Sequence, residues 1–131
     1  MIEVWIPTQN EFWDFAGKCK ALYEHSQKAI TDSNSFEFII NNTFFYLFTE
    51  NRKLIGAVYY FVDNEGKLML NGFSKRKTHL LNIKCLKMSL KWFNKDIYAE
   101  AQNRASAFCL LRCGFRRIGK YRESKLFVFK P

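Results

Sequence analysis

The chain has 131 residues, of which 48% are hydrophobic and 18% aromatic, including 14 Phe. This composition excludes an intrinsically disordered chain and is sufficient for one domain with a single hydrophobic core, which we expect over residues 1–131. No apolar run approaches the roughly 18 residues of a membrane-spanning helix. The first residues lack the basic and apolar blocks of a secretory signal, so we expect a cytoplasmic protein.

The net charge of +9 is distributed unevenly. Residues 1–65 contain 5 Lys/Arg and 9 Asp/Glu, whereas residues 66–131 contain 16 Lys/Arg and 3 Asp/Glu. An excess of positive charge in one half of a domain favours an anionic partner, either nucleic acid or an acidic protein surface.

The cysteines do not form a recognisable ligand or disulfide pattern. No C-x-x-C pair occurs among the four cysteines, which are Cys19, Cys85, Cys109 and Cys113, and the chain has only two histidines. We therefore expect neither a disulfide framework nor a metal site.

Hydrophobic periodicity predicts the elements of the first half in chain order. Residues 2–6 alternate as a strand and are stopped by Pro7. A helix then reaches about residue 29, capped by Thr8 or Asn10 and burying one face; that face contains Phe12, Phe15, Cys19, Leu22 and Tyr23. Residues 36–41 fit either a short helix or a strand. Strands follow at residues 43–49 and 54–62.

The second half continues with a hairpin turn at residues 63–66 (D-N-E-G), which leads into a strand at residues 67–72. A helix is expected over residues 78–93, a strand over 96–101, a short helix after Asn103, and a last strand over 125–129. Because strands and helices alternate without a linker or repeat, we predict one mixed α/β (α+β) domain.

Residues 103–115 read N-R-A-S-A-F-C-L-L-R-C-G-F. The Asn103 side chain can cap a helix, and Gly114 can adopt the left-handed conformation that ends one. With the element order, this segment resembles the closing motif N-x-x-A-x-x-x-Y-x-K-x-G-F of the GNAT superfamily of N-acetyltransferases. The resemblance implies a central, mostly antiparallel sheet flanked by helices, acetyl-CoA as cofactor and an amine as acceptor.

GNAT enzymes hold the cofactor pyrophosphate in a turn between the fourth strand and third helix, with the pattern Q/R-x-x-G-x-G/A. Backbone N–H groups at a helix start bind the anion, and glycines allow close approach. The matching turn follows Phe73 and has no glycine, so charge would replace backbone contacts here. The resemblance implies cofactor contacts from Ser74, Lys75, Arg76, Lys77, Thr78, His79 and Asn103.

The family's proton donor is usually a Tyr seven residues after the Asn. Leu110 stands at that position here and cannot donate a proton. Its neighbours Cys109 and Cys113 are either substitutes or plain core residues.

The family's base is often a Glu on the fourth strand, but residues 68–71 (L-M-L-N) contain no carboxylate. The nearest candidate is Glu100 on the next strand, with Tyr98 on the same side of that strand. Glu100 could instead form an ion pair with Arg104.

Basic residues recur on the predicted helix over residues 78–93 and beyond. They are Lys84, Lys87, Lys91 and Lys95, and nearby lie Arg112, Arg116 and Arg117. They form either a solvated surface or a docking surface for an anionic partner.

Three hypotheses follow. The first is an active acetyltransferase that moves acetyl from acetyl-CoA to an amine, with Glu100 or a bound water as base. The second is a GNAT-fold protein that has lost or nearly lost catalysis and acts as a basic binding or structural module. The third is a different small basic α/β fold. We favour a divergent relative of the acetyltransferases in which activity is weak or lost. The short length and the K-R-K turn are also similar to small GNAT-like proteins of tailed phages, some of them virion-associated, which would place the chain in host cytoplasm or virion.

Overall fold

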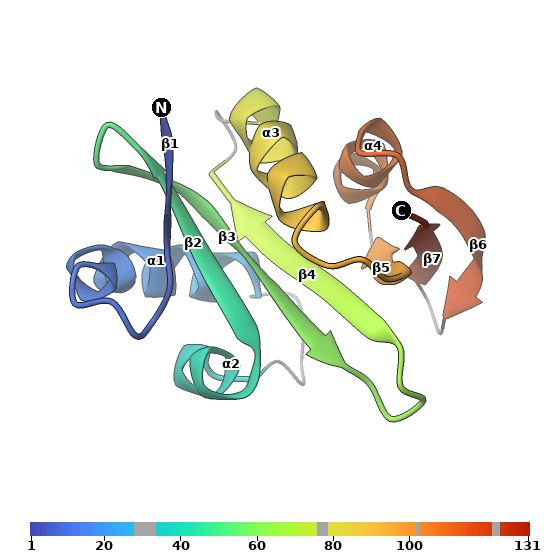
Figure 1. The fold of residues 1–131 in the computed structure, drawn as a ribbon, viewed down its shortest axis with the longest axis horizontal. Coiled ribbons are helices and arrows are strands. Elements are labelled where there is room, and N and C mark those ends of the chain that lie inside the picture. Colours follow the sequence, from blue (N-terminus) through green and yellow to red (C-terminus); the bar gives the residue numbers. More distant parts are fainter. Residues whose placement is uncertain (28–33, 76–78, 102, 122–123) are drawn as a thin grey trace. The chain divides into compact units, whose positions relative to one another are not determined.

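The computed structural model describes residues 1–131 apart from 28–33, 76–78, 102 and 122–123 (Figure 1). The described part contains seven strands and four helices. In chain order these are β1 (Ile2–Trp5), α1 (Phe12–Ser26), α2 (Phe36–Asn42), β2 (Phe44–Glu50), β3 (Lys53–Val62), β4 (Leu68–Ser74), α3 (His79–Leu90), β5 (Ile97–Ala101), α4 (Arg104–Arg112), β6 (Arg116–Tyr121) and β7 (Ser124–Phe129).

The strands form one sheet in the order β1-β2-β3-β4-β5-β7-β6. Strand β5 pairs in parallel with β4 and antiparallel with β7, and the β1–β2 and β6–β7 pairs are antiparallel. The predicted mixed α+β class with a mostly antiparallel sheet is therefore confirmed.

The chain divides into two compact units that alternate along the sequence. Unit 1 comprises Met1–Tyr59 and Gly72–Asn82, and unit 2 comprises Tyr60–Asn71 and Ile83–Pro131. The single domain expected over residues 1–131 stays a prediction.

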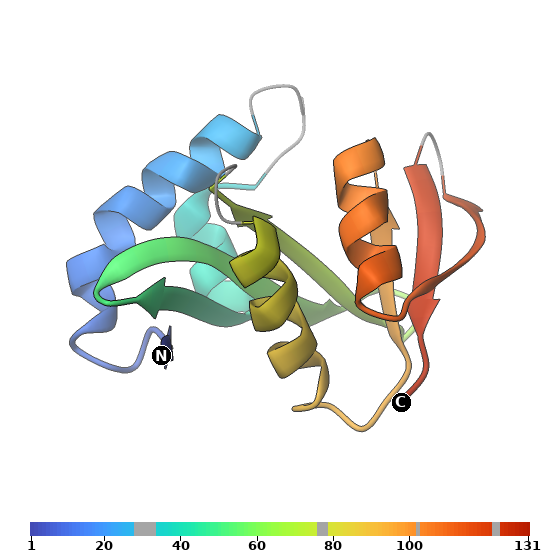
Figure 2. The same cartoon turned by 90° about the horizontal axis from the view of Figure 1, so that it is seen from above.

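Unit 1 is built on aromatic packing. The Phe45 ring of β2 contacts Phe12 of α1 and Phe36 of α2, with centroids 5.9 and 5.7 Å apart. The same ring stacks on Tyr59 of β3 at 6.0 Å. Both helices therefore pack on the Phe45 side of β2, and Figure 2 shows α1 and α2 beside one another.

The start of α1 differs from the prediction. The helix begins at Phe12, and its N-cap residue, Glu11, makes no side-chain cap. The turn before it is held by the Gln9 side chain, whose Oε1 accepts from the Ile6 amide at 2.8 Å. The predicted caps at Thr8 and Asn10 are wrong. The turn held by Gln9 occupies these positions, and the helix therefore starts after Glu11. The predicted end near residue 29 lies outside the described residues.

The ambiguous segment at residues 36–41 is the helix α2. The Ser35 hydroxyl accepts from the Phe38 amide at 3.1 Å, which is an N-cap that favours helix over strand. Phe36, Ile39 and Ile40 are buried at helical spacing. The cap, rather than the apolar content, therefore decides the conformation.

In unit 2 the predicted hairpin turn at residues 63–66 is confirmed. The Asp63 carboxylate accepts from the backbone amides of Glu65 and Lys67 at 2.9 and 2.8 Å, and Gly66 has φ of +80°. An Asp side chain that bonds amides two and four residues on fixes such a turn, and glycine adopts positive φ without strain.

Strand β6 was not predicted. It lies at the edge of the sheet beside β7, and its sequence R-R-I-G-K-Y contains three cations and one glycine. A register shift between Arg117 and Gly119 breaks the alternation of the strand. Charges and bulges are common on edge strands and hide the apolar alternation on which the prediction relied.

Candidate functional site

The turn after β4 is described as far as Lys75. The Ser74 hydroxyl accepts from the Asn82 amide side chain at 2.6 Å, and the Lys75 amide donates to the Ile55 carbonyl at 3.1 Å. Arg76, Lys77 and Thr78 lie outside the described residues. His79 is described only as the first residue of α3.

Close packing of β3 and β4 fixes the approach to this turn. A Cβ at Gly56 would meet the Phe73 carbonyl and lie 2.8 Å from Ser74 Cα, and one at Gly72 would lie 3.0 Å from the Ala57 carbonyl. Phe73 is buried against Tyr23, with ring centroids 5.3 Å apart. The glycines here serve the contact between two strands.

The described part of this turn, Ser74 and Lys75, does not form a backbone cradle for a pyrophosphate. Such a cradle needs amides that point at the anion, and glycines where the chain approaches it. The Lys75 amide donates to the Ile55 carbonyl, and Gly56 and Gly72 each face a neighbouring strand. The exposed Lys75 side chain could attract an anion by charge alone.

Strand β5 in unit 2 has two different faces. Ile97, Ala99 and Ala101 are buried, whereas Tyr98 is half-buried and Glu100 exposed. The predicted placement of Tyr98 and Glu100 on one side of the strand is therefore confirmed. The Lys67 ammonium lies 5.4 Å from the centre of the Tyr98 ring. The ion pairs of the described residues do not include one between Glu100 and Arg104.

Helix α4 has the predicted beginning and end. The Asn103 side chain accepts from the Ser106 amide at 2.8 Å. Gly114 has φ of +97°, and the Phe115 amide returns to the Leu110 carbonyl at 3.0 Å. Asn103 therefore has a structural role as a cap, and a cofactor contact from it stays a prediction.

The position of the family's proton donor is apolar and inside the protein. Leu110 is only 7% exposed. The Cys113 thiol is buried and donates to the Ile83 carbonyl at 3.9 Å. Burial raises the pKa of Cys113 to about 11, and it also raises the pKa of Cys109. Both thiols stay protonated at neutral pH, and the contact with Ile83 gives Cys113 a packing role.

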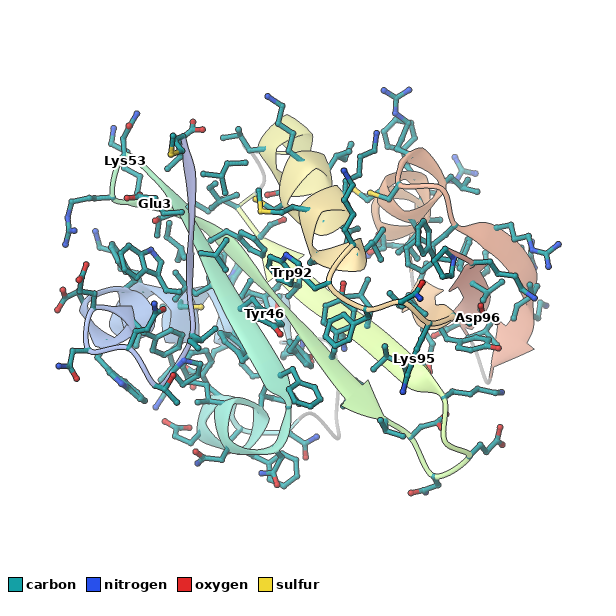
Figure 3. All side chains as sticks on the ribbon, in the orientation of Figure 1. Glu3, Tyr46, Lys53, Trp92, Lys95 and Asp96 are labelled. Carbon is teal, nitrogen blue, oxygen red and sulfur yellow. The ribbon has the colours of Figure 1, made fainter. Side chains whose placement is uncertain are left out.

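The row of basic residues predicted on the helix over residues 78–93 is shorter than expected. Lys84 and Lys87 are exposed on α3, but that helix ends at Leu90. Lys91 lies in the following turn, where its amide bonds the Met88 carbonyl at 3.3 Å. Lys95 lies in the loop before β5, beside Asp96 (Figure 3). A helix through residue 93 is therefore wrong, because a turn replaces its last residues.

Sequence reasoning missed part of the basic surface of unit 2. Arg112, Arg116 and Arg117 are exposed as expected, and so are Arg104, Lys120 and Lys125. The last two face each other across β6 and β7. The signal was the absence of any Asp or Glu between Ala101 and Tyr121.

A small hollow lies within unit 1, between α1 and α2. It measures about 190 Å³ and is lined mainly by Trp13, Gly17, Phe36 and Ile40. A Cβ at Gly17 would meet no atom within 4 Å. The hollow is mostly apolar, and its two charged lining residues, Lys20 and Glu37, form an ion pair with each other at 2.6 Å.

The described residues offer neither a metal site nor a membrane-spanning helix. Among them, no group of three or more His, Cys, Asp or Glu side chains is placed to hold a metal ion. None of the described helices is long and apolar enough to cross a membrane.

Similar structures define the fold. The chain matches an N-acetyltransferase from Staphylococcus aureus Mu50 with a TM-score of 0.75 and 13% identity, over 99% of this chain and 97% of the other. The chain has the GNAT fold. It also matches the PaiA N-acetyltransferase from Thermoplasma acidophilum in complex with coenzyme A, with a TM-score of 0.65 and 13% identity, over 100% and 99% of the two chains.

An aminoglycoside acetyltransferase in complex with coenzyme A matches with a TM-score of 0.71 and 12% identity, over 99% of this chain and 95% of that one. No protein-family model and no curated protein matches the sequence. The GNAT fold predicted from the motif and element order is confirmed, at identities that establish the fold alone.

Proposed function

We propose that this chain is a divergent GNAT-fold protein in which acetyl transfer is weak or lost. The observation that carries the proposal is Leu110, which is buried where the resemblance implies a tyrosine proton donor. A leaving thiolate has no acid at that position, and the Cys113 thiol is buried and directed at the Ile83 carbonyl. Removing a positioned acid typically costs 10²- to 10⁴-fold in rate.

Any remaining activity depends on the open face of β5. Glu100 is the one carboxylate of that strand, and we assign it as the base that takes a proton from an amine acceptor. Tyr98 stands two residues earlier on the same side. Lys67 covers part of the Tyr98 ring, so the acceptor reaches Glu100 more readily than Tyr98.

The cofactor proposal is correspondingly limited. Acetyl-CoA would be held by the charges of Lys75, Arg76 and Lys77, with Ser74, Thr78 and His79 beside them in sequence, rather than by a glycine cradle. A contact from Asn103, which the resemblance implies, is part of the same proposal. Two GNAT structures of the same fold are complexes with coenzyme A, which supports testing this ligand first.

Thermal unfolding with and without millimolar acetyl-CoA tests the cofactor proposal, with ATP as a polyanion control. A ligand at 100 times its Kd adds about 2.7 kcal/mol, which is several degrees for a chain of this size. A shift clearly larger with acetyl-CoA than with ATP supports a CoA site. Equal shifts, or none, reject it.

A transfer assay tests the weak-activity proposal directly. Acetylation of a panel of small amines by the wild-type chain should be slow or absent, and Leu110→Tyr restores the missing hydroxyl. Rapid transfer by the wild-type chain that Glu100→Gln leaves unchanged would contradict both the loss of activity and the assigned base.

A second candidate function is supported by the charges of unit 2. Ten of its cations form no ion pair with another described residue: Lys84, Lys87, Lys91, Lys95, Arg104, Arg112, Arg116, Arg117, Lys120 and Lys125. We propose that they make this chain a basic binding module with an anionic partner. Its place in a host cytoplasm or a virion, and its kinship with phage proteins, remain proposals from the sequence.

A further inference from the structure

The surface formed by α4 and the strands β6 and β7 is strongly basic. The hairpin turn between these strands contains Arg122 and Glu123, which lie outside the described residues. We call it the α4–hairpin surface and define it by its exposed cations, which are Arg104, Arg112, Arg117, Lys120 and Lys125. No Asp or Glu occurs between Ala101 and Tyr121 in the sequence. Negative charge is therefore absent from α4 and from β6.

The irregularity in β6 gathers the hairpin cations on one face of the sheet. Arg117 is opposite Phe127 and Lys120 is opposite Lys125, and Phe127 and Lys125 are two residues apart on β7. Residues two apart in a strand share a face, and directly opposite residues do too. Arg117, Lys120 and Lys125 therefore point to the same side, although Arg117 and Lys120 are three residues apart.

Helix α4 lies on that same side. Phe115, just after the helix, contacts Phe129 with ring centroids 5.6 Å apart, and a Cβ at Gly114 would lie 3.5 Å from the Phe129 ring. Phe129 is two residues from Phe127 and shares its face. Figure 2 shows α4 alongside the strands of unit 2. The cations of the helix and of the hairpin thus border one surface.

Two of these cations oppose each other directly. Lys120 and Lys125 are exposed partners in the β6–β7 register. Like charges at directly opposite positions destabilise a strand pair. Neither forms an ion pair with another described residue. An anion between them would remove this repulsion, so the surface is complementary to negative charge.

The surface also presents an aromatic ring. Phe108 is 53% exposed in the middle of α4, and the Arg112 guanidinium lies 5.9 Å from its ring centre. An exposed ring beside a guanidinium that forms no ion pair with another described residue offers stacking to a base and charge to a phosphate. An acidic protein surface would use the charges but has no need of the ring.

We propose that the α4–hairpin surface binds single-stranded nucleic acid without reading its sequence, through phosphate contacts of the five cations and base stacking on Phe108. This inference rests on the second candidate function and adds to it the class of partner and the place of contact.

The test measures the anisotropy of a fluorescein-labelled 20-nucleotide oligo-dT with the full chain at 50 and 200 mM NaCl. Five phosphate contacts give a salt slope of about −3.5, so affinity should fall roughly 100-fold over this range. Lys120→Gln with Lys125→Gln should flatten the slope by about 1.4 and weaken binding at 50 mM NaCl. Absence of saturable binding at 50 mM NaCl overturns the proposal.

A matched variant controls for net charge. Lys18→Gln with Lys53→Gln removes the same charge from exposed positions of unit 1 and should leave oligo-dT binding nearly unchanged. An equal loss in both double variants would show attraction to overall charge and would overturn the proposed surface.

The stacking contribution has its own pair of variants. Phe108→Ala should weaken binding about tenfold without changing the salt slope, in line with the stacking energy of one base. Leu111→Ala removes a similarly exposed apolar side chain of α4 and should have little effect. Identical losses from both would reject stacking.

A poly-Glu peptide distinguishes the two classes of partner. Competition by poly-Glu that equals competition by unlabelled oligo-dT, at matched charge, would assign the surface to an acidic protein and overturn the nucleic-acid proposal. The acetyl-CoA thermal shift is measured on the same Lys120→Gln, Lys125→Gln chain. An unchanged shift shows that acetyl-CoA binding does not depend on the α4–hairpin surface, so each of the two proposals can be rejected without the other.

Discussion

The two units of this chain use their side chains in opposite ways. Unit 1 is held by aromatic packing around Phe45, and several of its charges are paired, such as Lys20 with Glu37 at 2.6 Å and Arg52 with Asp14 at 3.8 Å. Even its buried Thr49 is bonded, accepting from the Trp5 indole at 2.8 Å and donating to Glu3 at 3.0 Å.

Unit 2 carries 13 Lys/Arg against 5 Asp/Glu, and most of its cations have no acidic partner among the described residues. Unpaired charges of one sign contribute repulsion rather than stability. The comparison indicates that unit 1 is arranged chiefly for stability, whereas the surface of unit 2 is arranged for a ligand. Substitutions in the two units should therefore affect different measurements.

The largest expected effect is on the core of unit 1. Phe12→Ala removes a fully buried ring that contacts Phe45 and should cost about 3–5 kcal/mol of unfolding free energy. Urea unfolding followed by circular dichroism measures it. Arg117→Ala in unit 2 is the control and should change stability by less than about 0.5 kcal/mol. An equal loss of unfolding free energy in both variants would contradict the proposed difference between the two units.

Two glycine variants test how closely the backbone is packed within unit 1. Gly56→Ala places a methyl group against the backbone of Phe73 and Ser74 and should cost roughly 1–3 kcal/mol. Gly17→Ala points into open space on α1 and should stabilise by up to about 1 kcal/mol, because alanine favours the helix. Denaturant midpoints of both variants check the opposite signs, and a stable Gly56→Ala protein would contradict the close contact.

The helix caps allow a test in both units. Asn103→Ala in unit 2 and Ser35→Ala in unit 1 each remove one capping hydrogen bond and should each cost about 1 kcal/mol. Asn103→Asp keeps the acceptor oxygen and should retain the stability. A loss of acetyl-CoA binding in Asn103→Asp, at unchanged stability, would show that the Asn side chain also contacts the cofactor.

The smallest effect on stability has the opposite sign and belongs to unit 2. Lys125→Glu replaces a repulsive pair with Lys120 by an attractive one and should stabilise by about 0.2–1 kcal/mol. The same change should weaken oligo-dT binding. A variant that loses both stability and binding would show that the lysine pair is structural.

The sequence was sufficient for the fold where local chemistry is strong. The Asn103 cap, the Gly114 helix end and the D-N-E-G turn each depend on one or two side chains that act on nearby backbone, and all three are confirmed. The start of α1 was missed because the backbone turn around Gln9 competes with the expected caps. Strand β6 was missed because its stability comes from pairing with β7 rather than from its own pattern.

The candidate site was predictable to a smaller extent. The spacing from Asn103 placed Leu110 correctly on a helix, but not inside the protein, because burial depends on the strands that the helix covers. The hairpin cations Lys120 and Lys125 were not recognised, since only the register of β6 and β7 brings them face to face. The hydrogen bond from the Lys75 amide to the Ile55 carbonyl likewise joins residues distant in the sequence, so the local sequence could not predict it.

The hydrogen bond from the Lys75 amide to the Ile55 carbonyl has a consequence for how this protein could change during evolution. Both groups belong to the backbone, so no replacement of a side chain frees the amide, and proline at position 75 would delete it. Glycines introduced into the K-R-K segment would add freedom but would leave this bond in place. Release of this amide for an anion would require an inserted or deleted residue that shifts the strand pairing, which is a rarer event than a point mutation.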